Sequence, residues 1–516
     1  MKTSSIPLAL ILMIPAFAAD KVHLTIDASR PGAKIDRNIF GQFAEHLGHG
    51  IYEGIWVGPD SKIPNTRGIR NDVVAALTAL KVPNVRWPGG CFADEYHWRK
   101  GIGPAGKRAV TLNPNWGGVT EPNTLGTDEF MDFLGQIGSH AYLSINVGSG
   151  TPEEAAEWLE YMTAPNVTTL GAERAANGHA QPYEVPFLGI GNESWDCGGN
   201  MTVEYYLTQL KKYARFVRND NPAQTGSHEM LRIAVGPGDA NTDWTEAVMK
   251  AYQQRHWSWD MNGLSLHSYT VVKWPPSYDS VSFGVTEYNQ ILKSTLDMEK
   301  LVATNSAVMD KYDPKKQVAL VVDEWGAWYK QLPGTHEGFL AQQNSLRDAI
   351  LASLNLNIFA RHADRVRMAN IAQMINVLQA MILTDKEKML LTPTYYVYRM
   401  YVPFQDATFT PVEYDAGSYA DGLPRLDAIA ARDASGKLRL AVTNLDAERA
   451  LEMEVDLKGA AARAVSGETL TGAKVNSLNT FDAPATVTPR NIAAKLEAGR
   501  ITLTVEPKSV TVITIE

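Results

Sequence analysis

The sequence has no surplus of positive charge and, beyond its N-terminus, no long apolar run. Its 57 acidic and 48 basic side chains give a net charge of −9, which argues against nucleic acid and anionic membranes as partners. After the first twenty residues no segment is apolar enough to cross a bilayer. The 516 residues, 45% hydrophobic and 20% charged, suit a globular protein with one large and one smaller domain.

Several catalytic signatures are also missing. No glycine-rich GxGxxG or GxxxxGKS/T loop follows a predicted strand, which argues against an open nucleotide-binding sheet. No GxSxG elbow occurs, so a Ser–His–Asp hydrolase is disfavoured. Two carboxylate–histidine groups, Glu45–His46 with His49 and Asp94–Glu95 with His97, lack HExxH spacing. We therefore expect neither a metal nor an organic cofactor.

The first residues combine a positive charge with an apolar stretch. Lys2 precedes the run Ile6–Ile14, and the Ala-Phe-Ala sequence at 16–18 suits a cleavage site. We predict a signal peptide over residues 1–19 and an exported chain, periplasmic or extracellular, with a retained anchor as the alternative. Export would permit a disulfide between Cys91 and Cys197, the only cysteines, and two separate buried thiols are the alternative.

A repeated alternation of short strands and helices fills residues 37–400. Eight strands are predicted, most of them ending in polar residues: Asn38–Glu45, Val82–Arg86, Ala141–Asn146, Phe187–Ile190, Arg232–Gly236, Leu264–His267, Val318–Glu324 and Met368–Gln373. Helices are predicted between them at Asn71–Leu80, Thr127–Ile137, Thr151–Tyr161, Val203–Val217 and Gln342–Ala360. Eight such units predict an α/β fold, a (β/α)8 TIM barrel, with the strand ends gathered at one face.

The pattern changes after residue 400. Residues 401–516 alternate apolar and polar side chains in short runs separated by turns, which predicts an all-β sandwich domain at the C-terminus. An isolated strand pattern in residues 20–36 has no helix after it, and we expect that strand to join the sandwich.

Two of the predicted barrel strands end in a carboxylate next to a tryptophan. Glu193 follows the fourth strand and lies near Trp195, and Glu324 ends the seventh strand and precedes Trp325. An apolar neighbour favours the protonated form of a carboxyl group, so Glu193 is a candidate general acid. We expect these strands to face each other across the barrel mouth, where two carboxylates could hydrolyse a glycosidic bond.

Other polar strand ends suit a sugar pocket. Candidates for hydrogen bonds to sugar hydroxyl groups are Glu45, Asn192, His267, Tyr269 and Gln373, while Arg86 could orient a carboxylate. Each of these side chains taken alone is more often structural.

Six stretches carry a resemblance to a known family: FGQFAEHLG, NVRWPGGCFADEYHW, GIGNESWDCGGNM, LSLHSY, VVDEWGAWY and NIAQMINVLQ. In this order the chain resembles the α-L-arabinofuranosidases of glycoside hydrolase family 51. The resemblance implies a (β/α)8 barrel with a β-sandwich, and a retaining mechanism with Glu193 as acid/base and Glu324 as nucleophile. It implies that Arg86 supports the nucleophile and that the ring of the sugar is contacted by Glu45, Asn192, Tyr269 and Gln373.

The resemblance also bears on Cys91 and on the ligand. Many members have asparagine where this chain has Cys91, while in some relatives that cysteine is paired with the one matching Cys197. The implied partners are plant cell-wall arabinose-containing oligo- and polysaccharides, with terminal groups released from arabinoxylan or arabinan. Family members are often hexamers. The alternatives are endo-glucanase or xylanase activity on the same scaffold, or a sugar-binding barrel without catalysis.

Overall fold

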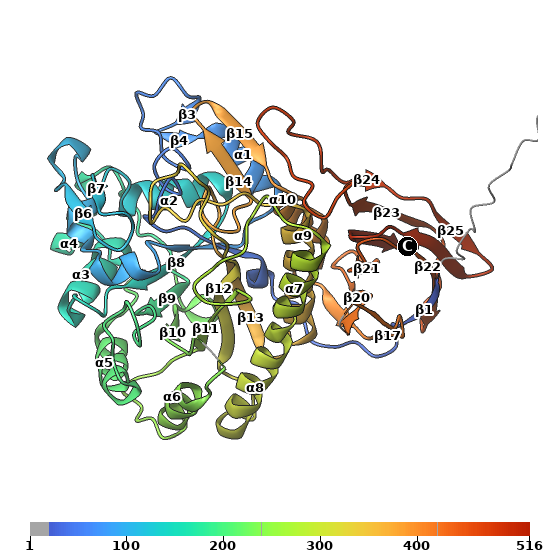
Figure 1. Ribbon diagram of the computed structural model, residues 1–516. Helices are drawn as coiled ribbons and strands as arrows, with labels where there is room; N and C mark the ends of the chain where they lie inside the picture. The colour runs from blue at the N-terminus through green and yellow to red at the C-terminus, as the bar shows by residue number, and fades with distance from the viewer. Residues whose placement is uncertain (1–19, 239, 421) are drawn as a thin grey trace, which may run out of the picture.

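Two bodies make up the protein, a helix-covered barrel and a β-sandwich packed against its side (Figure 1). The computed structural model describes residues 20–238, 240–420 and 422–516, so the predicted signal peptide lies outside the described residues.

Eight parallel strands close into the barrel in the order β10-β11-β12-β13-β2-β5-β8-β9. The predicted TIM barrel is therefore confirmed, and the strand ends differ from the predicted ones by at most three residues. The strands are β2 (Gly41–Phe43), β5 (Asn84–Trp87), β8 (His140–Ile145), β9 (Phe187–Ile190), β10 (Leu231–Ala234), β11 (Gly263–Thr270), β12 (Ala319–Ala327) and β13 (Val366–Ile371).

The helices pack around the outside of the barrel (Figure 1). They are α1 (Asn71–Ala79), α2 (Thr127–Ile137), α3 (Pro152–Thr163), α4 (Thr169–Ala176), α5 (Val203–Phe216), α6 (Asp243–Gln253), α7 (Val285–Thr295), α8 (Asp297–Tyr312), α9 (Leu346–Arg361) and α10 (Pro393–Tyr401). The sequence patterns missed α4, α6, α7, α8 and α10. In the described part of the chain, no helix combines the length and the apolar character needed to span a membrane.

Local capping explains two helix starts. At α3 the Thr151 hydroxyl accepts the N–H of Glu154 at 3.1 Å, as its position before Pro152 suggests. At α2 the cap is Gly126, one residue before the predicted start, and its N–H donates to the Glu129 carboxylate at 2.8 Å. The Thr127 hydroxyl instead accepts the indole N–H of Trp158 at 3.0 Å.

Small two-stranded hairpins lie in the loops. In the barrel they pair β3 (Asn65–Thr66) with β4 (Ile69–Arg70), β6 (Thr111–Asn113) with β7 (Val119–Glu121), and β14 (Ile382–Asp385) with β15 (Lys388–Leu391). Between two strands of the sandwich, β18 (Ser418–Tyr419) pairs with β19 (Leu423–Pro424).

Two sheets form the sandwich around a core of their own. The first has the order β17 (Val412–Tyr414), β1 (Asp20–Asp27), β22 (Leu451–Lys458), β26 (Arg500–Val505) and β25 (Ala494–Glu497). The second has the order β16 (Thr408–Thr410), β20 (Leu426–Arg432), β21 (Leu438–Asn444), β27 (Ser509–Ile515), β23 (Val465–Leu470) and β24 (Arg490–Asn491). The N-terminal β1 runs parallel to β22, so both ends of the described chain lie in this body.

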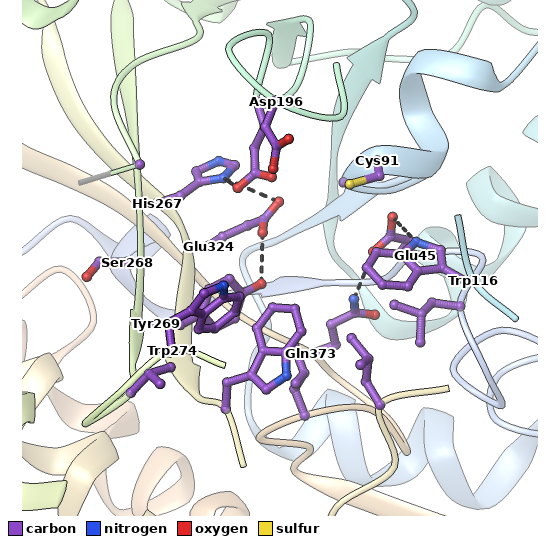
Figure 2. A pocket seen from close by; sticks show the side chains of 18 of the residues that line it. Glu45, Cys91, Trp116, Asp196, His267, Ser268, Tyr269, Trp274, Glu324 and Gln373 are labelled. Carbon is purple, nitrogen blue, oxygen red and sulfur yellow. Dashed lines mark hydrogen bonds and ion pairs between the residues drawn. The ribbon is translucent and has the colours of Figure 1, made fainter. Parts of the chain in front are cut away.

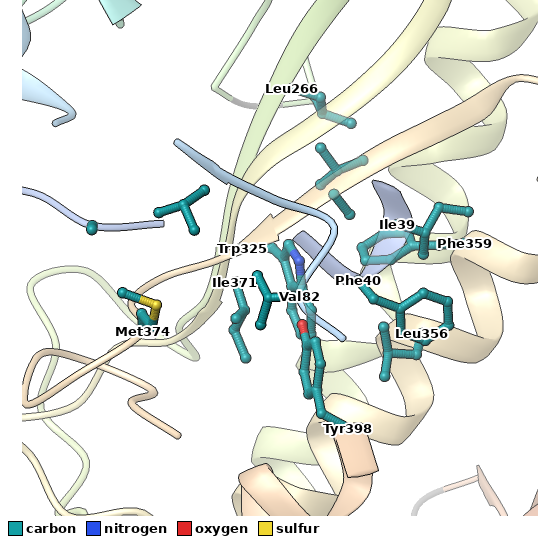
Figure 3. Packing of buried hydrophobic residues seen from close by; sticks show 14 of the residues in the cluster. Ile39, Phe40, Val82, Leu266, Trp325, Leu356, Phe359, Ile371, Met374 and Tyr398 are labelled. Atoms are coloured by element: carbon teal, nitrogen blue, oxygen red, sulfur yellow. The ribbon is translucent and has the colours of Figure 1, made fainter. Parts of the chain in front are cut away.

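Helix α9 joins the two bodies. Nearly all its residues are buried, and it contacts barrel strands on one side and β20, β21 and β27 on the other. Figure 3 shows the barrel side, where Phe359 of α9 meets Trp325 of β12 edge-to-face with ring centres 5.4 Å apart. On the sandwich side, Asp427 of β20 accepts bonds from Asn357 at 2.7 Å and from Arg361 at 2.8 Å.

Replacing Asp427 should loosen this junction. Asp427→Ala leaves the buried Asn357 amide without its acceptor and removes one of the two carboxylate partners of Arg361. We expect a loss of about 2–3 kcal/mol in stability. The matched control is Asp456→Ala, which removes an ion pair with Arg500 in which both side chains are about half exposed, and should cost under about 1 kcal/mol. Thermal unfolding of both variants measures the difference, and equal melting temperatures would contradict it.

Candidate active site

The C-terminal ends of the barrel strands surround a cavity of about 420 Å³. Figure 2 shows its side chains converging from several strands, as parallel barrels place them. Of the predicted site residues, Glu45, Cys91, Glu193, His267, Tyr269, Glu324 and Gln373 line it directly. Arg86 and Asn192 lie just beneath, buried and in contact with these side chains.

Glu193 and Glu324 meet in this cavity. One oxygen of each carboxylate and a ring nitrogen of His267 all lie within 4.8 Å of one another. The prediction that the two strands lie opposite each other is nevertheless wrong. Only β10 and β11 separate β9 from β12. Their end loops bring the carboxylates together.

Local backbone irregularities aim both side chains. The pairing of β12 with β13 shifts between Val322 and Trp325, and such a bulge re-aims side chains. Glu324 therefore lines the cavity and Asp323 lies buried beneath it against His267, while Trp325 turns into the core. Glu193 has φ +36°, a left-handed conformation that few non-glycine residues adopt. Its carbonyl accepts the N–H groups of Asp196 and Gly198, which stabilises this turn.

Glu324 is fixed by two donors. Arg86 donates to Oε1 at 2.7 Å and the Tyr269 hydroxyl donates to Oε2 at 2.8 Å. Arg86 is itself fully buried, lies 4.5 Å from the centre of the Phe43 ring, and donates to the Asn192 side chain at 2.6 Å. The guanidinium holds the Glu324 carboxylate in one orientation by charge-assisted bonds.

His267 lies between three carboxylates. Its Nδ1 is 2.8 Å from Glu193 and 3.6 Å from Glu324, and its Nε2 is 3.3 Å from Asp323. Burial alone would lower the pKa of His267, but Glu324 and Asp323 outweigh it and raise that pKa to about 10. The ring is therefore an imidazolium at neutral pH, and its Nδ1–H donates the hydrogen bond to Glu193.

Asp323 and Glu193 respond to this cation differently. Burial opposes ionisation of Asp323, yet His267, Arg86 and the Tyr142 hydroxyl outweigh it and lower the pKa of Asp323. Burial dominates at Glu193 and raises the pKa of that carboxyl above its ordinary value, although the bond from His267 opposes the rise. The cavity thus favours an ionised Asp323 and a protonated Glu193.

Glu45 forms a second polar group on the far wall. Its carboxylate accepts the indole N–H of Trp116 at 2.9 Å, the Phe92 N–H at 3.1 Å and the Gln373 amide at 3.1 Å. Burial, followed by the charge on Glu324, raises the pKa of Glu45 to about 7. This side chain can accept or donate a hydrogen bond near neutral pH.

Sequence reasoning missed several residues of the site. Asp94 accepts the N–H groups of Val147, Gly148 and Asn192 at 2.8–3.0 Å and so ties three loops together. Tyr142 donates to Asp323 at 2.6 Å. Aromatic side chains wall the cavity: Trp116, Trp195, Trp274 and Trp328. Only Trp195 and Trp328 had a signal, namely their proximity to Glu193 and Glu324.

The carboxylates are poorly suited to hold a metal. Among the described residues, two clusters have close donor atoms: Glu193 with His267 and Glu324, and Cys91 with Glu193 and Cys197. In the first, an imidazolium and Arg86 already supply positive charge, and a protonated imidazole is no ligand. In the second, Cys91 and Cys197 form a disulfide, so neither sulfur is a thiolate.

Comparison with known proteins decides the family. Residues 76–236 match the model of the α-L-arabinofuranosidase 1 domain, and residues 323–509 match the α-L-arabinofuranosidase C-terminal domain. A Bacteroides ovatus protein named intracellular exo-α-L-arabinofuranosidase is 41% identical, over 98% of this chain and all of the relative. The GH51 arabinofuranosidase from Xanthomonas axonopodis pv. citri is 50% identical with a TM-score of 0.93, over 96% of this chain and all of that one.

This chain belongs to the α-L-arabinofuranosidases of glycoside hydrolase family 51. The resemblance seen in the six sequence stretches is confirmed, and the chain is a glycoside hydrolase. Another member, the α-L-arabinofuranosidase of Thermotoga maritima in an arabinose complex, is 30% identical with a TM-score of 0.81, over 96% of this chain and all of that one.

The comparison corrects the prediction of export. That prediction rested on Lys2 and the apolar run in residues 1–19, yet the 41% identical family 51 relative is named intracellular. The prediction of a periplasmic or extracellular location is therefore contradicted, and the predicted signal peptide gains no support. A charge followed by an apolar run is a pattern of composition, and it occurs at N-termini that are not export signals.

The disulfide yields a direct test in this family 51 member. It joins residues 106 apart in sequence, with Cα atoms 5.5 Å apart. Air-oxidised protein, unfolded in denaturant, should bind no thiol reagent until a reductant exposes both cysteines. Reduction should lower stability by about 2–4 kcal/mol, because it frees a long loop in the unfolded chain.

The control is Cys197→Ser, in which Cys91 should react without reductant. Labelling of both cysteines in the untreated wild type would contradict the bridge.

Proposed function

We propose that this chain is an exo-acting α-L-arabinofuranosidase that removes terminal arabinofuranosyl groups with retention of configuration. The observation that carries the proposal is the separation of Glu193 and Glu324, whose nearest oxygens lie within 4.8 Å. Retaining glycosidases hold their carboxyl groups about 5–5.5 Å apart, whereas inverting enzymes leave room for a water molecule at about 6.5–9.5 Å. The names of the relatives support the same activity.

The proposed mechanism assigns one step to each carboxyl group. Glu193, with its raised pKa, donates its proton to the glycosidic oxygen as the bond to C1 breaks. Glu324, held by Arg86 and Tyr269, attacks C1 and forms a glycosyl-enzyme ester. Glu193 then removes a proton from water, which adds to C1 and releases arabinose and free Glu324.

The remaining polar side chains are proposed to bind the sugar ring. Glu45 with Gln373 on one wall, and Asn192, His267 and Tyr269 on the other, offer both donors and acceptors. Arg86 is proposed to support Glu324 rather than the sugar, because both of its terminal nitrogens are already engaged. Cys91 lines the cavity through a disulfide and contributes no thiol.

The proposed substrates are arabinoxylan, arabinan and their oligosaccharides. Walls on several sides, including Trp116 and Trp274, favour binding of a terminal group over the passage of a polymer backbone. A product profile on arabinoxylan and on branched and linear arabinan, with β-1,4-glucan as the comparison, would separate this activity from an endo-glucanase or xylanase.

We also propose residues 37–400 as the catalytic domain and residues 20–36 and 401–516 as the sandwich. A homo-oligomer is proposed as well, which sedimentation would test.

Removal of either carboxylate should abolish turnover. We expect Glu193→Ala to lower kcat/KM on an arabino-oligosaccharide by about 10²–10⁴-fold, the usual contribution of general acid catalysis. Glu324→Ala should lose at least as much, because no covalent intermediate can form. Steady-state hydrolysis measures both, and Glu387→Ala, an exposed carboxylate in the β14–β15 turn, is the control.

Azide distinguishes the two roles. With Glu193→Ala, added azide should restore turnover and give an arabinofuranosyl azide of retained anomeric configuration. With Glu324→Ala, the azide product should have the inverted configuration. An interchange of these outcomes, or near-normal activity in either variant, would refute the assignment.

The pH profile should depend on His267. Its bond and charge lower the pKa of Glu193, so His267→Gln should raise that pKa further. Since Glu193 must be protonated for the first step, the alkaline limb of kcat/KM should move to higher pH. The pH dependence is measured on a substrate with a poor leaving group, and His256→Gln, an exposed histidine, is the control. An unchanged or lowered limb would contradict the role of His267.

A further inference from the structure

A second cavity, about 380 Å³ in volume, adjoins the active site. It lies beyond the end of β10 and at the starts of α5 and α6. Its walls include Trp195, Met201, Pro237, Gly238, Asp243 and Trp244. Trp195 and Gly238 also line the first cavity, so the two spaces share a wall.

Both tryptophans are held by the end of β10. The Trp195 indole N–H donates to the carbonyl of Gly236 at 3.0 Å, and that of Trp244 donates to the carbonyl of Val235 at 2.8 Å. Each polar edge is therefore satisfied within the protein, and what the rings offer to the cavity is apolar surface. Rings that are fixed before binding lose little conformational entropy when a ligand arrives.

Packing behind the rings fixes them further. Tyr206 stacks on Trp244 with ring centres 5.5 Å apart, which covers one face of that indole. The backbone of Gly238 lies directly against Trp195, since a Cβ atom there would come within 2.3 Å of the indole ring. Glycine is the residue that permits this contact.

The second cavity lies close to Glu193. Trp195 is two residues from Glu193, which on the proposed function protonates the leaving oxygen. The leaving sugar must therefore emerge next to Glu193, along the wall that Trp195 shares between the cavities.

We infer that the second cavity is a subsite for the leaving group and that it binds a pyranose ring, such as β-xylopyranose. This inference rests on the proposed function. A pyranose chair with equatorial hydroxyl groups presents broad C–H faces that stack on an indole, whereas the smaller furanose ring offers less of such a face. Asp243 and Asn241, exposed at the rim, are placed to bond the hydroxyl groups. Arabinosylated xylo-oligosaccharides are then preferred to arabinan fragments.

The test compares two substrates that differ only in the leaving group. Trp244→Ala should lower kcat/KM on arabinofuranosyl-xylotriose by about tenfold, mainly through KM, because a stacking face is lost. The same variant should leave kcat/KM on methyl α-L-arabinofuranoside nearly unchanged. Trp244→Phe keeps an aromatic face and should retain most activity on both. The matched control is Trp257→Ala, a tryptophan 81% exposed and outside both cavities, which should change neither.

The outcomes separate the two proposals. Equal losses on both substrates, or no loss on either, would overturn the pyranose subsite. If Trp244→Ala does not fold, Asp243→Ala decides in its place, with a rise in KM for the xylotriose substrate alone as the supporting result and unchanged KM as the refuting one. A wild type that hydrolyses neither substrate would overturn the proposed function itself.

Discussion

The charge balance at the barrel mouth is the constraint on which the site depends. Two cations, Arg86 and His267, lie among four carboxyl groups in a buried space: Glu45, Glu193, Asp323 and Glu324. Arg86 lies 2.7 Å from Glu324, His267 lies 2.8 Å from Glu193, and both cations lie within 3.6 Å of Asp323. Glu45 and Glu193 have raised pKa values, and burial is the largest cause of both shifts. The raised pKa of Glu193, the proposed acid, thus follows from its burial within this cluster.

The scaffold sets that distribution by register. His267 pairs with Glu324 across β11 and β12 only because the pairing shifts between Ser265 and His267. The irregularity at Asp323 and Glu324 turns Trp325 away from the cavity. In the core, Trp325 meets Phe359 of α9. The irregularity that orients Glu324, the proposed nucleophile, therefore also anchors the barrel to α9, the helix that contacts the sandwich.

The sequence predicted the strands well because each is a short apolar run with a polar end, and eight such runs suit one closed sheet. It also predicted the two carboxylates. It could not predict their protonation, because the charge on His267 depends on contacts between three strands. The tryptophans show the same limit: Trp195 follows Glu193 and Trp325 follows Glu324 in sequence, but only Trp195 lines the cavity. The loop residue Trp116 had no pattern to reveal it, and Asp94 stood out only as part of a carboxylate–histidine group without metal-site spacing.

The disulfide between Cys91 and Cys197 does not depend on export. Export is contradicted by an intracellular relative, yet the sulfurs are bonded, so barrel geometry rather than compartment brings them together. Asp94 explains how. From the segment that begins at Cys91, it binds the N–H of Asn192 and two N–H groups after β8, which connects the same loops without sulfur. Burial raises the pKa of Asp94 to about 7 against these three donors. The loops that carry Glu193 would therefore stay in register with the thiols reduced.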